Sequence, residues 1–425
     1  MTFLLLNQTF HPDVMATGQY LTEAALRLVE RGHQVTVVTS RRAYDHPETQ
    51  FTNQQTWRGI RIYRVASTGY GKGAKWRRAA DFGSFLVLCA LRLARLPRPD
   101  VVVALTTPPL ISFLGALVAR LRRCRFVYWV MDLNPDEAIV AGWLRPESLV
   151  AGVLEAMSRF SLRQAKKVIA LDRFMRDRIV AKGIALAQVA VIPLWSHDRE
   201  VKFDPEGRER FRQVHGLDGK FVVMYSGNHS PVHPLDTLLG AAQRLQRDES
   251  IVFCFIGGCS EWRKIKEKAE GRMENAEGGE QEAEAGNCSA PAFQRSSFSN
   301  ILCVPYQPLH QLAGSLSAAD LHVVVMGNAF VGLVHPCKIY NIMAVGAPML
   351  YIGPRLSHAT EIPSAANGEA RCLSAGHSEV ELVVQQILRA RAETKQRSRH
   401  YSLLPHSLFA KESVLPKLIS ELESA

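Results

Sequence analysis

A glycine, a proline, a lysine and an amide lie close together in the segment GLVHPCKIYNIMAVGAP, residues 332–348. The flanking apolar runs, LHVVVMG (321–327) and PMLYIG (348–353), are typical of buried strands in a parallel sheet. We therefore predict a helix that begins at Pro336 and presents free backbone N–H groups at the carboxyl edge of that sheet. Lys338 adds a positive charge beside these donors, so the segment predicts a phosphate-binding site. The alternative is an amphipathic core helix with a solvated lysine.

Three carboxylates form a second candidate site in the first half of the chain. Asp132, Asp136 and Glu137 lie at or just after the end of the apolar run RFVYWVMD (125–132), which predicts a buried strand. A carboxylate at the carboxyl end of a parallel strand can orient or deprotonate a hydroxyl group. We expect Asp132 to be the catalytic residue first, and Asp136 or Glu137 second. The alternative is that Asp132 only caps the helix beyond it.

Apolar strand patterns alternate with helical patterns along most of the chain. The first βαβ unit spans residues 3–40, and a second alternating set begins at Lys220 after the polar passage 196–218. We therefore predict an α/β fold with two Rossmann-like, doubly wound parallel-sheet domains, residues 1–196 and 197–399. Residues 271–299 are rich in Glu, Gly, Ala and Ser, and we expect them to form a flexible insertion in the second domain.

The positive charge of the chain is concentrated in its first half. The 425 residues carry a net charge of +11, and residues 1–195 hold 27 Lys and Arg against 14 Asp and Glu. Such an excess favours anionic lipid head groups, a phosphorylated acceptor or nucleic acid as a partner. Because no zinc-finger, homeodomain or RNA-recognition signature accompanies it, we do not expect nucleic acid binding.

Cysteine usage and the first residues predict a cytoplasmic protein. The eight cysteines include no C-x-x-C pair, and several lie in apolar runs, as buried reduced thiols do. The start MTFLLLNQTF lacks the basic region of a secretory signal. The apolar segment 101–119 is long enough to span a bilayer, but Thr-Thr-Pro-Pro at 106–109 indicates a strand, a turn and a helix instead. Residues 82–98 could form a helix at the membrane surface.

Two strings in this chain resemble family 4 of the retaining glycosyltransferases. The helix segment is similar to the donor-binding helix of that family, and Pro336-Cys337-Lys338-Ile339-Tyr340 is similar to the P-S-K-x-Y string of its subgroup for O-antigen and exopolysaccharide (colanic-acid type). The string YWVMDLNPDE (128–137) matches the W-x-x-D-L-x-P-[DE] of the same subgroup. The resemblance implies the GT-B fold, with the two domains facing each other across a cleft and a C-terminal helix, about residues 400–425, that packs back on the first domain.

The resemblance also implies where a nucleotide sugar would bind. The implied donor-binding residues are Gly18, Asn228, His233, Tyr306, His335, Lys338 and Asn341. Gly18 would let the backbone approach a diphosphate, and Asn228 and His233 stand in a loop where the family has Arg and Lys, with His233 able to become cationic. The E-x7-E carboxylates of the family would fall at Leu333 and Asn341. Both are missing, although an amide can still hydrogen-bond a ribose.

The expected function is that of a retaining glycosyltransferase in bacterial cell-surface polysaccharide biosynthesis. It would move a sugar from a nucleotide-sugar donor to a lipid-linked or growing oligosaccharide acceptor, at the inner face of the cell membrane with peripheral membrane contact. We expect no metal and no cofactor, since GT-B enzymes stabilise the leaving diphosphate with helix dipoles and basic side chains. The alternatives are a catalytically inactive GT-B scaffold and a GT-B nucleotide-sugar epimerase.

Overall fold

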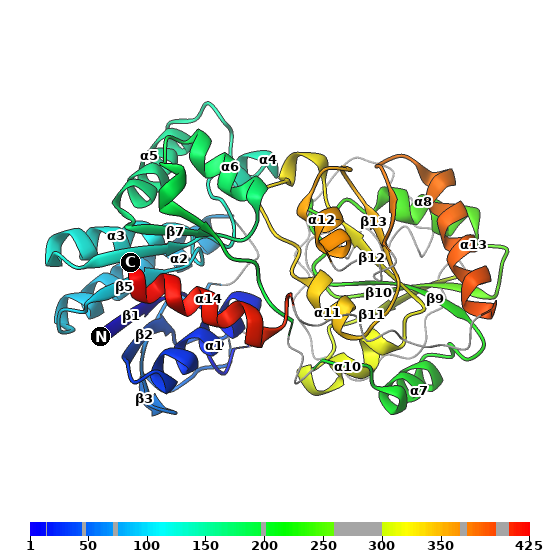
Figure 1. The fold of residues 1–425 in the computed structure, drawn as a ribbon, viewed down its shortest axis with the longest axis horizontal. Coiled ribbons are helices and arrows are strands. Elements are labelled where there is room, and N and C mark those ends of the chain that lie inside the picture. Colours follow the sequence, from blue (N-terminus) through cyan, green and yellow to red (C-terminus); the bar gives the residue numbers. More distant parts are fainter. Residues whose placement is uncertain are drawn as a thin grey trace. The chain divides into compact units, whose positions relative to one another are not determined.

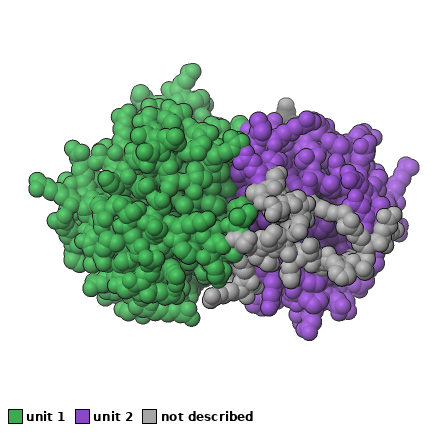
Figure 2. Space-filling view, in the orientation of Figure 1, with its two compact units in different colours: residues 1–195, 329–335, 407–425 green, residues 196–328, 336–406 purple. Residues whose placement is uncertain are grey.

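The computed structural model describes residues 1–13, 15–44, 48–70, 75–196, 201–258, 300–365, 372–396 and 408–425. The chain divides into two compact units (Figure 2). Unit 1 comprises residues 1–195, 329–335 and 407–425, and unit 2 comprises residues 196–328 and 336–406. The predicted insertion at 271–299 lies outside the described residues.

Unit 1 is built on an eight-stranded sheet in the order β3-β4-β2-β1-β5-β6-β7-β8. All neighbouring strands run parallel except β3 and β4. Its strands are β1 (Thr2–Leu6), β2 (Gln34–Ser40), β3 (Gln54–Trp57), β4 (Ile60–Val65), β5 (Val101–Ala104), β6 (Arg125–Trp129), β7 (Lys167–Ala170) and β8 (Val189–Val191). Because β1, β5 and β6 are buried and apolar, the loops at their carboxyl ends are fixed by the sheet.

Helices cover this sheet, as Figure 1 shows. They are α1 (Ala16–Glu30), α2 (Lys75–Arg95), α3 (Ile111–Arg122), α4 (Asp136–Val140), α5 (Leu149–Gln164), α6 (Arg173–Ala181) and α14 (Lys411–Ser424), with a 3-10 turn at Leu186–Gln188. The C-terminal helix α14 packs on α1, where Lys411 pairs with Glu23 at 3.0 Å and Glu423 pairs with Arg31 at 3.0 Å. Helix α3 packs on both α2 and α5.

A segment from late in the sequence, residues 329–335, belongs to unit 1. The Leu333 carbonyl accepts a hydrogen bond from the Leu133 N–H at 2.8 Å, and the Val331 carbonyl accepts one from Arg178 Nε at 2.6 Å. Gly332 has a φ of +73°, and a Cβ at this position would lie 2.6 Å from the Phe174 carbonyl oxygen. Only glycine satisfies both the backbone angle and the close approach.

Unit 2 contains a six-stranded parallel sheet in the order β11-β10-β9-β12-β13-β14. The strands are β9 (Phe221–Ser226), β10 (Ile251–Ile256), β11 (Ile301–Val304), β12 (Leu321–Val325), β13 (Met349–Ile352) and β14 (Cys372–Ala375). The helices are α7 (Pro205–Val214), α8 (Asp236–Arg244), α10 (Leu309–Ser317), α11 (Lys338–Ala344), α12 (His358–Ala365) and α13 (Val380–Gln396).

Alternate residues of the unit 2 strands lie in two separate hydrophobic cores, one on each face of the sheet. Val223 and Phe253 belong to the core that includes α8 and α13, whereas Met224 and Cys254 belong to the core near α7. Both faces of the sheet are therefore covered, which explains why its strands read as continuous apolar runs.

Most strands were predicted from the sequence, whereas α7, which lies in the polar passage 196–218, and the helices α12 and α13 were not. The edge strands β3 and β14 were missed, because they are four residues long and partly polar or exposed. Helix α11 begins at Lys338, two residues after the predicted start at Pro336. The apolar segment 101–119 forms β5, a turn and part of α3, as predicted. In the described part of the chain, we find no helix with the length and apolar character to cross a membrane.

A buried ion network between α7 and the residue before β12 gives a stability prediction. Asp320 is buried and bonds Arg208 at 2.8 Å, Arg212 at 3.3 Å and the Val222 N–H at 2.8 Å. Asp320→Ala leaves two buried guanidinium groups without their carboxylate, so we expect a loss of roughly 3–5 kcal/mol in unfolding free energy. Urea unfolding measures it.

The matched control is Asp218→Ala, since Asp218 is an exposed residue of the same unit. It should stay within about 0.5 kcal/mol of the unchanged protein. Equal unfolding midpoints for the two variants would contradict the assignment of Asp320 as a structural anchor.

Candidate functional site

The sequence candidates fall into two groups, one in each unit. In unit 2, α11 follows the carboxyl end of β12 and carries Lys338 and Asn341. The N–H groups of Ile339 and Tyr340 already approach the carbonyls of Pro336 and Cys337, at 3.4 and 3.2 Å. The first turn thus offers fewer free backbone donors than the sequence predicted, and the two polar side chains become its main feature.

The Lys338 amine is buried against an aromatic ring. Its Nζ lies 3.8 Å from the centre of the Tyr225 ring, at the carboxyl end of β9, and makes no hydrogen bond with the described residues. A Cβ on Gly227 would lie 2.8 Å from this Nζ, so the glycine leaves room for the amine. Burial lowers the Lys338 pKa from 10.5 to about 7, because removal from water disfavours the charged form.

Three histidines of unit 2 whose pKa values respond to the charge of this amine are held neutral. Burial, assisted by the positive charge of Lys338, lowers the pKa of His233 to about 3, and it lowers those of His229 and His322 to about 4. His233 Nδ1 lies 2.7 Å from the Val325 carbonyl oxygen and therefore donates to it. The expectation that His233 could become cationic is wrong: the ring fastens its loop to β12.

Asn341 shares a helix face with Lys338, since the two residues are three positions apart. Its Oδ1 is buried and has no hydrogen-bond partner among the described residues. A buried acceptor without a partner is costly, by about 1–3 kcal/mol. The amine of Lys338 and the amide oxygen of Asn341 are therefore a donor and an acceptor that a polar ligand could satisfy together.

The loops after β9 and β10 are tied to each other beside this helix. The Gly227 N–H donates to the Ile256 carbonyl at 2.9 Å, and the His229 N–H donates to the Gly258 carbonyl at 3.0 Å. Asn228 is engaged on both sides: its carbonyl accepts from the Tyr225 hydroxyl at 2.7 Å and its Oδ1 accepts from Tyr306. The Tyr306 ring remains half exposed, so it offers an aromatic face at the rim of this site.

Unit 1 brings together Asp132, Asp172 and His335. Asp172 caps α6, its Oδ1 accepting from the Met175 N–H at 2.8 Å, while its Oδ2 lies 2.9 Å from Nδ1 of His335. Burial raises the pKa of Asp132 to about 6, and the positive charge available to His335 opposes that rise. With this pKa, the Asp132 carboxyl group loses its proton just below neutral pH. His335, predicted as a donor residue, belongs to unit 1 rather than to the unit of Lys338.

The other two carboxylate candidates have structural partners. Asp136 pairs with the buried Lys182 at 2.7 Å, and Lys182 also pairs with Glu155 at 2.7 Å. This network joins α4, α5 and the end of α6. Glu137 accepts a hydrogen bond from Asn134 Nδ2 at 3.2 Å.

Gly18 lies inside α1 rather than in the loop before it. A Cβ there would lie 3.1 Å from the backbone carbon of Thr9, so the glycine allows α1 to pack on its own preceding loop. This packing gives a sufficient physical reason for the glycine without a ligand.

Several residues of these groups were not among the predicted site residues, including Tyr225, Asp172 and Lys182. Asp172 did leave a signal, because it follows an apolar strand just as Asp132 does. The roles of Tyr225 and Lys182 depend on contacts across the fold, which no local pattern reports.

Comparisons with known proteins show what this chain is similar to. Residues 16–195 match the family described as glycosyl transferase 4-like domain. A protein described as a colanic acid biosynthesis glycosyl transferase, WcaI of Escherichia coli (strain K12), is 25% identical over 438 residues, which cover 99% of this chain and 100% of WcaI. The glycosyltransferase WbjE of Pseudomonas aeruginosa is 25% identical over 64% of this chain and 62% of its own length.

Solved structures share the fold across the whole chain. The Anabaena protein Alr3699/HepE, in complex with UDP-glucose, has a TM-score of 0.69 at 14% identity and covers 100% of both chains. Sucrose-phosphate synthase of Thermosynechococcus elongatus has a TM-score of 0.70 at 14% identity, over 100% of this chain and 98% of its own. At this identity the likeness establishes the fold alone.

The lowered pKa of the Lys338 amine predicts how the stability of the protein changes with pH. The pKa of Lys338 is about 7 in the folded chain against 10.5 when unfolded, so the unfolded chain binds more protons between these values. Stability should rise with pH by roughly 1.4 kcal/mol per unit in that window through this residue. Lys338→Met should remove that contribution and be more stable than the unchanged protein at pH 7.

Urea unfolding of both proteins at pH 7.5 and 9.5 measures the difference in slope. Lys411→Met is the control, because Lys411 is paired with Glu23 at 3.0 Å in unit 1. If Lys338→Met and the unchanged protein gain stability equally with pH, the amine is solvated.

Proposed function

We propose that this chain, which is a glycosyltransferase of family 4 with the GT-B fold, transfers a sugar with retention of configuration to a cell-surface saccharide. The proposal depends above all on α11, where Lys338 Nζ and Asn341 Oδ1 are both buried without a hydrogen-bond partner among the described residues. Such atoms are expected where a polar ligand completes the structure.

The donor is a nucleotide sugar held by unit 2. Its diphosphate lies against Lys338, which regains its proton beside the anion, and its ribose hydroxyls donate to Asn341 Oδ1. The half-exposed Tyr306 ring offers a surface for the base. Because the Anabaena protein of the same fold is described as a complex with UDP-glucose, a uridine nucleotide is the first donor to test.

The acceptor hydroxyl reacts at unit 1. Asp132 accepts the proton of that hydroxyl, while the new bond forms on the same face of the anomeric carbon from which the diphosphate departs, so that the configuration is retained. With a pKa of about 6, Asp132 is ionised at neutral pH and still basic enough to take the proton. Asp172 positions His335, whose positive charge would favour the ionised carboxylate.

The acceptor is a lipid-linked or growing oligosaccharide at the inner face of the cell membrane. WcaI is described as acting in colanic acid biosynthesis, which supports a polysaccharide product. Helix α2 supports membrane contact, since Val87 is 61% and Leu91 50% exposed, and arginines 92 and 95 lie in its last turn.

A donor screen followed by product analysis tests this function. Thermal shift with UDP-, GDP- and dTDP-sugars should identify one stabilising nucleotide. The matching donor should be hydrolysed slowly and transferred when an acceptor is added, with the anomeric configuration retained by NMR. Nucleotide binding without turnover would indicate a scaffold, and a changed donor sugar without net transfer would indicate an epimerase.

Asn341→Leu should weaken UDP binding by roughly 3- to 10-fold, because one hydrogen bond to the ribose is lost. Isothermal titration measures the dissociation constant. Asn341→Glu restores an acceptor and should bind UDP much as the unchanged protein does. Equal affinity of the leucine variant would remove α11 from the donor site.

Asp132→Asn should lower kcat/KM at pH 7.5 by roughly 10²- to 10⁴-fold, since an amide cannot take the proton. In the unchanged protein, kcat/KM should fall as pH drops below about 6, where Asp132 becomes protonated. The variant should lack this acid limb. Asp177→Asn, at an exposed carboxylate of the same unit, is the control and should keep both rate and profile. An acid limb that persists in Asp132→Asn would assign the proton transfer elsewhere.

A further inference from the structure

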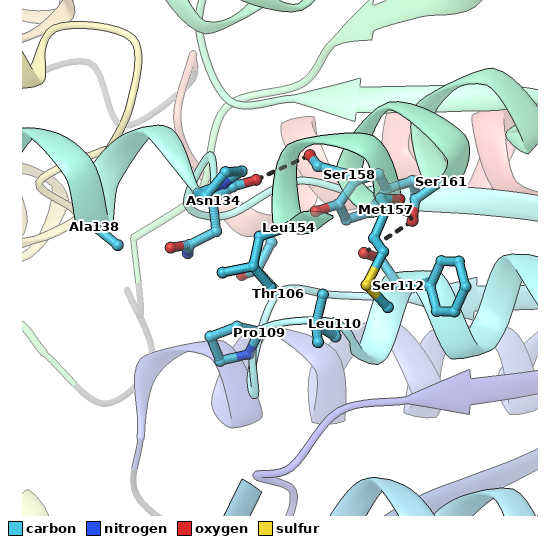
Figure 3. A pocket seen from close by; sticks show the side chains of 13 residues that line it. Thr106, Pro109, Leu110, Ser112, Asn134, Ala138, Leu154, Met157, Ser158 and Ser161 are labelled. Carbon is cyan, nitrogen blue, oxygen red and sulfur yellow. Dashed lines mark hydrogen bonds between the residues drawn. The ribbon is translucent and has the colours of Figure 1, made fainter. Parts of the chain in front are cut away.

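A cavity of about 110 Å³ lies inside unit 1, between α3, α5 and the loops that follow β5 and β6 (Figure 3). Its walls are largely hydrocarbon: Pro109, Leu110 and Phe113 on one side and Leu154 and Met157 of α5 on the other. The volume is somewhat smaller than the roughly 150 Å³ of an apolar cavity known to hold benzene. It therefore suits a short piece of hydrocarbon rather than a sugar ring.

The polar groups of the cavity wall are mostly committed to the protein. The Ser158 hydroxyl donates to the Asn134 carbonyl at 2.9 Å, and the Ser161 hydroxyl donates to the Met157 carbonyl at 2.9 Å. Thr106 Oγ1 is buried and lacks a partner among the described residues. Among the described residues of the lining there is no lysine, arginine or carboxylate. A saccharide or an anion would leave most of its polar atoms unsatisfied here.

The outer side of the same helix is apolar as well. Leu149 is 90% exposed, and Val150 and Val153 are each 59% exposed, which places an apolar stripe on the first turns of α5. Trp143, just before this helix, is 46% exposed. An exposed apolar stripe with a tryptophan beside it is typical of a surface that meets lipid. The excess of basic residues in 1–195 is complementary to anionic lipid head groups.

The stretch of chain that follows β6 links this cavity to the proposed proton acceptor. Asn134, Pro135 and Ala138 line the cavity, and the same stretch begins just after Asp132, the proposed proton acceptor. A molecule that placed its hydroxyl at Asp132 would therefore have the cavity within the same part of unit 1.

We propose that this cavity binds a segment of the hydrocarbon chain of a lipid-linked acceptor, and that the apolar stripe of α5 meets the rest of the chain at the membrane surface. The proposal rests on the proposed function, because it assigns the lipid part of the acceptor to a site in the unit that carries Asp132. The cavity thereby makes the enzyme selective for acceptors that carry a hydrocarbon chain.

Decyl phosphate, below its micelle concentration, is the probe, and inorganic phosphate is its polar counterpart. In titration calorimetry the unchanged protein should bind decyl phosphate and not phosphate at the same concentrations. Met157→Trp, which fills the cavity, should bind decyl phosphate at least about tenfold more weakly. Leu186→Trp is the matched control, because it adds the same ring at a residue that is 59% exposed and outside the cavity lining.

A second measurement on the unchanged protein guards against a misfolded variant. Decyl phosphate with a diazirine at the end of its chain should crosslink to α3 or α5 residues of the cavity wall, as mapped by mass spectrometry. Crosslinks elsewhere, or equal binding of decyl phosphate by Met157→Trp, would overturn the proposal. Nucleotide titration separates the two hypotheses: if the unchanged protein binds none of UDP, GDP and dTDP, the donor proposal fails. If all variants bind one of these nucleotides but the probe does not bind, only the cavity proposal fails.

Discussion

The amine of Lys338 is taken out of water and placed against the Tyr225 ring, without a hydrogen-bond partner among the described residues. Desolvation of an amine is unfavourable, and it lowers the Lys338 pKa to about 7. The surrounding groups are compatible with a buried amine. Gly227 leaves space for it, and His229 and His233 stay neutral, so they add no second positive charge. A protein that keeps such a group has stability to gain from a bound anion, which is why α11 is the centre of the donor proposal.

The path of the chain near α11 links the two candidate sites. His335 belongs to unit 1, where it bonds Asp172, and Lys338, three residues later, belongs to unit 2. Gly332 makes the unit 1 part of this path feasible, because its φ of +73° and its approach to Phe174 exclude a side chain. The segment 329–335 therefore fixes His335, whose charge affects Asp132, while the next residues begin α11, the proposed donor helix. The proposed proton acceptor and the proposed donor contacts thus both depend on this short stretch of sequence.

Much of this architecture could be predicted, because buried parallel strands can be recognised in the sequence as apolar runs. The carboxyl ends of those runs led to Asp132 and, through the following helix, to Lys338 and Asn341. The assignment of residues 329–335 to unit 1 could not be predicted, since it depends on hydrogen bonds to Leu133 and Arg178. The apolar stripe of α5 was equally hidden, because a helical pattern does not tell which face is turned to solvent.

Proton uptake on nucleotide binding tests the central claim most directly. At pH 8 the free Lys338 is mostly neutral, and a bound diphosphate should restore its proton. Calorimetric titration with UDP in two buffers of different ionisation enthalpy gives the number of protons taken up. We predict a value approaching one per nucleotide for the unchanged protein and about zero for Lys338→Met. UDP binding without proton uptake by the unchanged protein would contradict the account.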